Sequence, residues 1–258
     1  MAKAKRKVQK PSQGSKKKNT KKSSSSIWGL ILFFGVIIGI GTWYLIKTPK
    51  SKISKNEFIQ EIPKGFSSFG IDISHHQGKI DWKTLFDREK FDSIIGFVYC
   101  KATEGHTHVD TQWETNRKTL NNRGIPNGAY HFFTTNEEPL AQAKHFLNYW
   151  KKREVDLPPV LDVETEGNSD QELIKNMHLW LKEVEMKTGM RPVIYTSYNF
   201  FETKFLNDFK DYNFWIAAYS RKPDKIDDPR ILHWQYSEEG TLPGIDEAVD
   251  FNVSKIAF

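Results

Sequence analysis

Apolar runs alternate with polar, helix-like segments along most of the chain after residue 65. Each run is short, lies between turn residues and is rich in β-branched and aromatic residues, which is typical of a β-strand. Because helical segments follow the first five runs, the pattern predicts βα units and a mostly parallel sheet. The predicted strands are Phe69–Ser74, Ile94–Ala102, Gly128–Phe133, Pro159–Glu164, Pro192–Ser197, Phe214–Tyr219, Ile231–Tyr236 and Ala248–Val253.

Helix start and stop signals lie between these strands. A capping box, in which a serine or threonine precedes a glutamate by three positions, occurs at Ser169, Thr111 and Thr135 and predicts a helix after each. The helix after Ser169 carries apolar residues on one face and ends at Gly189. Shorter helices fit Trp82–Lys90 and Phe200–Phe209.

Five βα units followed by three strands predict an α/β fold, an irregular TIM-like barrel that comprises residues 66–258. Eight strands are enough to close a sheet on itself, and the catalytic groups of such barrels lie at the C-terminal ends of the strands.

The chain before the barrel has a different composition. Residues 1–26 are rich in Lys and Ser and contain no apolar cluster, so we expect a disordered basic tail. Ile27–Ile46 contains no charged residue and, at about 1.5 Å per residue, spans about 30 Å, which predicts a single transmembrane helix in the lipid bilayer. Residues 47–65 would form a flexible stalk.

Basic residues before the span predict a cytoplasmic N-terminus and a barrel domain on the outer face of the membrane. Because the basic tail adjoins the span directly, we expect it to contact anionic lipid headgroups rather than nucleic acid. A cleaved signal peptide is the competing interpretation, but the apolar run is long for one and no A-x-A site follows Ile46.

Composition narrows the function classes. The chain has 258 residues, of which 38% are hydrophobic, enough for one sizeable core. The first 22 residues hold ten Lys or Arg and no acid, so the formal net charge of +6 belongs to the tail and the rest of the chain is acidic. A single cysteine, Cys100, excludes an intrachain disulfide, and its apolar strand favours a buried residue over a nucleophile.

Acidic residues stand near the ends of several predicted strands. Asp162 and Glu164 alternate with apolar residues, so both carboxyls face the same side, about 6.6 Å apart along the strand. Such a pair is expected to split its pKa values, with one group charged and its neighbour protonated, as cleavage of a glycosidic bond requires. Asp72 and Asp250 also alternate with apolar residues and would join the same site.

Aromatic residues gather near the same strand ends, and flat apolar rings suit a sugar-binding cleft. They are Tyr130, Tyr195, Trp215, Tyr219, Trp234 and Tyr236. Lys101 and Glu104, directly after the second strand, form a charged pair at the same rim, either as an ion pair or as part of the binding site.

A metal site is an alternative, because His75, His76, His106, His108 and His131 lie near strand ends. However, no H-E-x-x-H spacing occurs, and adjacent histidines on one loop can hardly bind one ion. A serine-nucleophile elbow and a phosphate-binding glycine loop are absent from the sequence as well. We therefore expect catalysis without a metal or other cofactor.

Eight segments, in this order, resemble the motif blocks of glycoside hydrolase family 25, the Chalaropsis-type muramidases: GIDISHHQGKIDW, FVYCKATEG, GAYHFF, PPVLDVETE, RPVIYTS, WIAAYS, HWQYS and GIDEAVDFN. The resemblance covers about Phe69 to Val253. The doubled His75-His76 and the stretch from His106 to His108 depart from the usual family pattern.

The resemblance implies an irregular barrel of five βα units and three further strands. It also implies hydrolysis of the β-1,4 bond between N-acetylmuramic acid and N-acetylglucosamine in peptidoglycan glycan strands. By motif position Glu164 resembles the general acid, Asp162 its charged partner, and Asp72 and Asp250 the flanking acids. The residues that resemble the sugar cleft are Tyr130, Tyr195, Trp234 and Gln235.

Several points stay open on the sequence. Asp162 or Asp250 could stabilise an oxocarbenium-like state directly or position the substrate's N-acetyl group, and the carboxylate separation does not decide between retention and inversion. A non-catalytic peptidoglycan-binding module tethered to the membrane is the alternative to an enzyme. A wall amidase would need a metal or a nucleophile that the sequence does not supply.

Overall fold

The computed structural model describes residues 62–86, 95–150, 157–220 and 228–258, which all belong to one compact unit. The predicted tail, the predicted transmembrane helix Ile27–Ile46 and most of the stalk lie outside the described residues. Within the described ranges, no helix combines the length and apolar character that a bilayer span requires.

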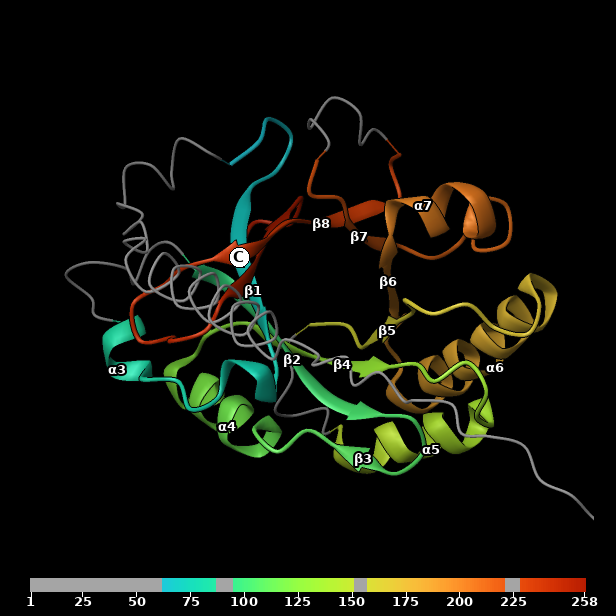
Figure 1. Ribbon diagram of the computed structural model, residues 1–258, viewed down its shortest axis with the longest axis horizontal. Coiled ribbons are helices and arrows are strands. Elements are labelled where there is room, and N and C mark those ends of the chain that lie inside the picture. The colour runs from blue at the N-terminus through green and yellow to red at the C-terminus, as the bar shows by residue number, and fades with distance from the viewer. Residues whose placement is uncertain (1–61, 87–94, 151–156, 221–227) are drawn as a thin grey trace, which may run out of the picture. The chain divides into compact units, whose positions relative to one another are not determined.

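Eight strands close into a barrel (Figure 1): β1 Ser68–Ile73, β2 Ile95–Glu104, β4 Asn127–Phe132, β5 Val160–Asp162, β6 Val193–Ser197, β7 Phe214–Ala217, β8 Ile231–Gly240 and β9 Val249–Ser254. Each strand pairs with the next in this order, and β9 also pairs with β1. The pairs are parallel except those of β9, which runs antiparallel to both β8 and β1. A short strand, β3 His108–Val109, pairs only with the end of β2. The predicted barrel is confirmed, with every strand at its expected place.

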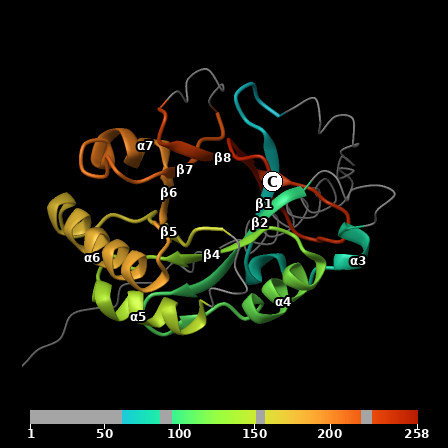
Figure 2. The same cartoon turned by 180° about the vertical axis from the view of Figure 1, so that it is seen from behind.

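Helices follow each of the first five barrel strands and lie outside the barrel (Figure 1, Figure 2). They are η1 His75–Gln77, α3 Trp82–Leu85, α4 Trp113–Arg123, α5 Pro139–Tyr149, α6 Asp170–Thr188, α7 Tyr198–Phe200 and η2 Phe201–Phe205.

One predicted helix cap is confirmed and two are wrong. Ser169 caps α6, since its hydroxyl accepts a hydrogen bond of 3.2 Å from the backbone N–H of Glu172. Neither α4 nor α5 has a side-chain cap; α5 begins at Pro139, whose fixed φ suits the first helical position. Thr135 instead donates its hydroxyl to the carbonyl oxygen of Glu166 at 3.0 Å. This threonine therefore joins the loops after β4 and β5.

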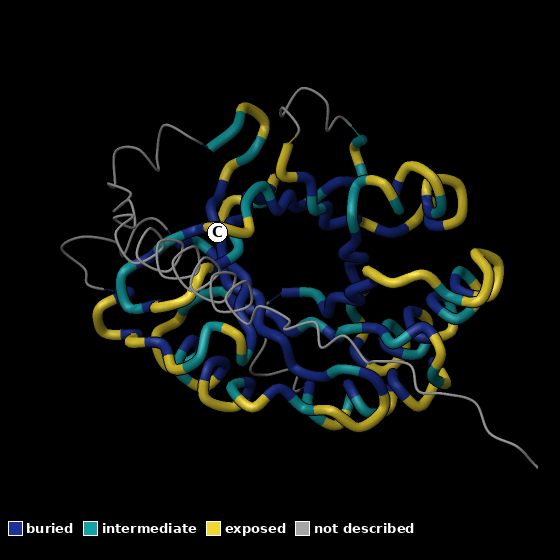
Figure 3. The backbone as a smooth tube through the Cα atoms, viewed as in Figure 1, coloured by how far each residue is buried: buried dark blue, intermediate teal, exposed yellow. Residues whose placement is uncertain are grey.

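Alternation along the strands sorts the apolar side chains into two layers. Those that point into the barrel form one cluster: Phe97, Tyr99, Leu157, Val160, Val193, Tyr195 and Trp215. Those that point outward pack under the helices, among them Ile71, Ile73, Leu161 and Val163. Figure 3 shows the buried strands in dark blue inside a rim of exposed loops and helix faces. Because their neighbours in sequence face outward, the acids of β1 and β5 face the barrel axis.

Gly128 on β4 shows how closely the barrel interior is packed. A Cβ atom at this position would overlap the ring of Tyr99 and lie 2.9 Å from the Cβ of Leu157. We expect Gly128→Ala to lower the free energy of unfolding by about 1–3 kcal/mol, because buried side chains must shift to admit the methyl group. Urea denaturation measures the change. Gly96→Ala on β2 is the matched control, since its added Cβ would lie 3.4 Å from the nearest atoms; equal losses in both variants would contradict the packing argument.

Candidate active site

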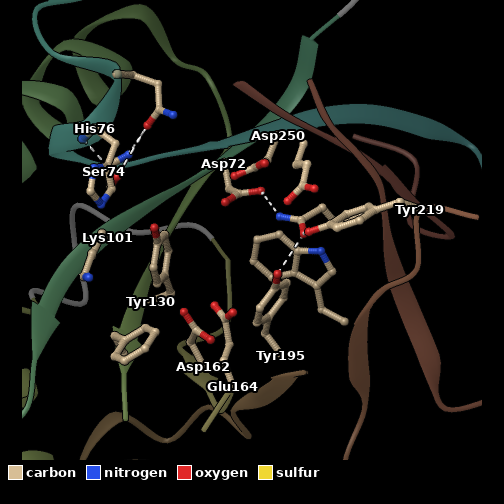
Figure 4. A pocket seen from close by; sticks show the side chains of 15 residues that line it. Asp72, Ser74, His76, Lys101, Tyr130, Asp162, Glu164, Tyr195, Tyr219 and Asp250 are labelled. Atoms are coloured by element: carbon tan, nitrogen blue, oxygen red, sulfur yellow. Dashed lines mark hydrogen bonds between the residues drawn. The ribbon is translucent and has the colours of Figure 1, made fainter. Parts of the chain in front are cut away.

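A cleft with a volume of about 250 Å³ opens at one end of the barrel. The C-terminal ends of β1 and β5 and the N-terminal end of the antiparallel β9 meet there. All four predicted acids line this cleft. Figure 4 shows Asp72 and Asp250 on one wall and Asp162 and Glu164 on the wall across from them. The structure thus brings together four carboxyls that are far apart in the sequence.

Asp162 and Glu164 differ in burial although they share a wall. Asp162 ends β5 and is 4% exposed, whereas Glu164 is exposed at the cleft. The backbone between them is held by two bonds at Val163, whose N–H donates to the Tyr195 carbonyl at 2.9 Å and whose carbonyl accepts the Thr196 hydroxyl at 2.7 Å. The backbone therefore keeps both residues at the mouth.

Burial raises the pKa of Asp162 well above its usual range, and the negative charge of Glu164 raises it further. The shift therefore favours the protonated form of Asp162 in the free protein. The motif assigns the charge to Asp162 and the proton to Glu164, and this assignment stays a prediction; in the free protein the burial of Asp162 acts against it. In addition, Oδ1 of Asp162 is buried and has no hydrogen-bond partner among the described residues.

Asp72 and Asp250 face each other directly, because they are Cα partners in the antiparallel pair of β1 and β9. Oδ2 of Asp72 accepts hydrogen bonds from the side-chain amides of Gln235 at 2.9 Å and Asn252 at 2.8 Å. Burial raises the pKa of Asp72 to about 6, against the lowering effect of these amides. Burial and the negative charge of Asp72 raise the pKa of Asp250 to about 8.

Lys101 and Glu104 form an ion pair, with 2.7 Å between Nζ and Oε2. Lys101 lines the cleft, is 7% exposed and lies over the ring of Phe132 at 4.8 Å. Its charge counteracts the rise in the pKa of Asp162. Glu104 does not line the cleft, and its ion pair holds Lys101 there.

Most of the predicted aromatic residues line the cleft, but the assignment of Trp234 is wrong. Its indole N–H donates to the carbonyl of Ala218 at 2.9 Å, and its ring packs against Phe66 in the outer layer. Tyr236 packs in the outer layer as well. The reason is strand alternation: Gln235 lies between them and faces inward. The predicted aromatic residues that do line the cleft are Tyr130, Tyr195, Trp215 and Tyr219.

Gln235 lines the cleft, yet its polar atoms are used inside the protein. Its Oε1 accepts the hydroxyls of Tyr195 at 2.7 Å and Tyr219 at 2.8 Å, and its Nε2 donates to Asp72. Gln235 is 2% exposed, so its main role is to hold Asp72, Tyr195 and Tyr219 in place.

Sequence reasoning missed several residues of the cleft, namely Ser74, Gln77, Phe132 and Glu238, and named His76 only as a rejected metal ligand and as a departure from the family pattern. Glu238 reaches the cleft because β8 continues to Gly240 with shifted register against β9, and such bulges redirect side chains. No sequence signal marks this bulge. For His76, the doubled histidine beside the first acid was the available signal.

Three of the histidines near the strand ends have side-chain partners of their own. Nδ1 of His75 lies 2.8 Å from Asp110, and Nδ1 of His106 lies 2.6 Å from Glu137. His131 is buried between Thr103 and Gln142, and burial lowers its pKa to about 3. In the part of the chain that the structure describes, no three His, Cys, Asp or Glu side chains are grouped as metal ligands.

Comparison with known proteins places the chain in one family. The family model described as "Glycosyl hydrolases family 25" matches residues 71–245. The uncharacterized protein YegX of Escherichia coli O157:H7 is 38% identical over 198 residues, which make up 76% of this chain and 72% of that protein.

Two solved structures are similar to the chain over the barrel. A bacterial lysozyme from Streptomyces coelicolor has 29% sequence identity and a TM-score of 0.64, and the match covers 74% of this chain and 93% of that one. The modular autolysin LytC from Streptococcus pneumoniae, solved in complex with a synthetic peptidoglycan ligand, has 25% identity and a TM-score of 0.62 over 72% of this chain and 46% of that one.

The raised pKa of Asp250 predicts a pH-dependent loss of stability. Because its pKa is about 8 in the folded protein against 3.8 ordinarily, folding becomes less favourable as the pH rises between these values. We expect Asp250→Asn, whose amide still donates to Asp72, to raise the melting temperature, with a larger gain at pH 8 than at pH 4. Thermal unfolding across this range measures it.

Asp81→Ala provides a control of opposite sign. Asp81 caps α3, and hydrogen bonds from Thr84 lower its pKa, so its contribution to stability is present above about pH 4 and is lost as the pH falls. The control should therefore lower the melting temperature at pH 8. A gain for Asp250→Asn that is equal at pH 4 and pH 8 would contradict the raised pKa.

Proposed function

The chain belongs to glycosyl hydrolase family 25, as a glycoside hydrolase of the muramidase type, and we propose that it cleaves the β-1,4 bond between N-acetylmuramic acid and N-acetylglucosamine in peptidoglycan. The observation that carries this proposal is the convergence of four carboxyls in one cleft beside aromatic side chains. The peptidoglycan ligand bound to the similar autolysin LytC supports the substrate class.

Glu164 is the group that protonates the glycosidic oxygen. It is the exposed member of its pair and can reach a bound glycan, whereas Asp162 is buried beside it. The proton that Asp162 holds in the free protein passes through the hydrogen bond between the two carboxyls, and Glu164 transfers it as the C1–O bond breaks. The leaving sugar departs with a free hydroxyl group, and both members of the pair are left as carboxylates.

Asp162 then acts on the sugar that carries the developing positive charge. Its buried Oδ1 lacks a partner among the described residues, which costs free energy unless a ligand supplies a donor. The acetamido N–H of the muramyl residue is a suitable donor. A carboxylate in this position orients the acetamido oxygen toward C1, so that the substrate's own group forms the new bond, and water later opens that intermediate with Glu164 as the base.

Glu164→Gln should lower the rate of hydrolysis at least about 100-fold, because the amide cannot deliver a proton. The measurement is the release of new reducing ends from purified peptidoglycan. Glu239→Gln, an exposed carboxylate on β8, is the matched control and should retain activity.

The products also separate the alternatives. New amino groups in place of reducing ends would indicate an amidase, and sedimentation with peptidoglycan without products would indicate a binding module. Full activity of Glu164→Gln would refute the role assigned to Glu164.

We also propose that Ile27–Ile46 anchors the enzyme in the bilayer, with the basic tail in the cytoplasm against anionic lipid headgroups and the barrel on the outer face. The support is the sequence: an uncharged apolar run of bilayer length that directly follows basic residues. A tethered enzyme of this kind would act on the wall beside its own membrane.

The full chain should therefore sediment with membranes and resist extraction at high pH. Val36→Arg combined with Ile38→Arg should release it, because each arginine near the centre of a span opposes insertion by about 2.5–3.5 kcal/mol. Immunoblots of cell fractions measure the distribution. Ser23→Arg with Ser24→Arg adds the same charges before the span and should change nothing; recovery of the unaltered chain in the medium alone would contradict the anchor.

A further inference from the structure

We propose that Asp72 and Asp250 work as a carboxyl dyad that carries one proton, held on Asp250, and that Asn252 is the positioning residue that keeps the charge on Asp72. The proposal rests on the function proposed for the cleft and adds a second proton-sharing pair to it. It also assigns a role to Asn252, a buried residue that does not line the cleft.

The backbone puts the two acids in contact. β1 and β9 are antiparallel, and Asp72 and Asp250 are direct Cα partners, so their side chains leave the sheet on the same face. Two ionised carboxylates in this position would repel each other in a poorly hydrated mouth. A single shared proton removes the repulsion and makes a hydrogen bond between them, which contributes to the pKa values of both groups.

Directional hydrogen bonds decide which of the two is charged. The indole N–H of Trp215 can only donate, and it donates to Oδ1 of Asn252 at 2.8 Å. The amide of Asn252 is therefore oriented with its NH₂ group toward Oδ2 of Asp72, 2.8 Å away. Trp215 thus prevents the amide from turning its oxygen toward Asp72.

Gln235, on β8, also presents its NH₂ group to Asp72. Two tyrosine hydroxyls donate to its Oε1, and its Nε2 donates to the same Oδ2 of Asp72 at 2.9 Å. An oxygen that accepts two amide donors is best satisfied as a carboxylate. The proton consequently rests on Asp250, for which no amide donor is present among the described residues.

Other acids also act on the dyad. Besides Asp72, Glu238 on β8 and Glu164 in the loop after β5 disfavour the ionisation of Asp250. Glu164 acts on Asp72 in the same direction, so it does not distinguish the two acids. The other titratable or charged groups that face the dyad or line the same cleft are Asp162, Tyr130, Tyr195, Tyr219, Cys100, Lys101 and His76.

A singly protonated dyad predicts a bell-shaped dependence of activity on pH. Below about pH 6 the dyad gains a second proton and loses its charge, and above about pH 8 it loses its only proton. Because the pKa of Asp162 is raised as well, the profile of the unaltered enzyme alone does not identify the dyad. A variant that removes a hydrogen-bond donor to Asp72 does identify the dyad.

Asn252→Leu is the decisive variant, since leucine keeps the branched shape of the asparagine side chain, with larger methyl groups, and has no donor. Loss of this hydrogen bond raises the pKa of Asp72, so the acidic limb of the kcat/KM profile should move upward by about one pH unit. A role in packing alone would lower activity equally at every pH. Trp215→Phe, which frees the Asn252 amide to turn, should move the same limb in the same direction by less.

Trp234→Phe is the matched control, because its indole N–H donates to Ala218 outside the cleft; the acidic limb should stay in place. Unchanged limbs in folded Asn252→Leu would overturn the proposal, and if that variant does not fold, unchanged limbs in Trp215→Phe would do so. Carbon-13 NMR titration of the aspartate carboxyls measures the pKa values of the dyad without substrate. An enzyme that hydrolyses no peptidoglycan would therefore disprove the proposed function and still leave the dyad testable.

Discussion

Four carboxyl groups that converge in one barrel mouth cannot all be ionised, and this constraint governs the chemistry of the cleft. Burial raises the pKa of three of them, Asp72, Asp162 and Asp250, and the neighbouring negative charges add to the effect. Among the described residues that line the cleft, Lys101 is the one lysine or arginine, and Glu104 partly neutralises it. The protein therefore has to store protons on these acids rather than balance their charges.

The barrel resolves the constraint by arranging the acids in two pairs on opposite walls. In one pair Asp162 and Glu164 are two residues apart on and after β5, and burial separates their roles. In the other, Asp72 and Asp250 come from strands near the two ends of the domain, brought together because β9 runs antiparallel between β8 and β1. A parallel strand in this place would bring its C-terminal end to the mouth, and Asp250, near the start of β9, would lie at the far end of the barrel.

The apolar interior of the barrel supports these pairs with directional contacts. Tyr195 and Trp215 pack their rings in the interior cluster, while their O–H and N–H groups donate to Gln235 and Asn252. The rings fix the positions of the two amides, and the amides fix the charge on Asp72. This arrangement holds together acids that repel each other. The raised pKa values show that it lowers the stability of the folded protein.

Local patterns in the sequence were sufficient for the architecture. Strand positions, the number of βα units and the inward direction of the four acids follow from alternation, because a residue's face on a strand depends only on its neighbours. The same rule separates Gln235 from Trp234, yet the aromatic character of Trp234 suggested a sugar platform, and only the assembled barrel shows that its ring lies in the outer layer.

Proton positions were beyond the sequence, for a physical reason. Whether Asp162 or Glu164 holds a proton depends on how deeply each is buried, and the charge on Asp72 depends on Asn252, 180 positions away in the chain. Burial and long-range hydrogen bonds exist only once the strands have closed. The sequence by itself determined which acids face the axis of the barrel, and the tertiary structure decided how those acids share their protons.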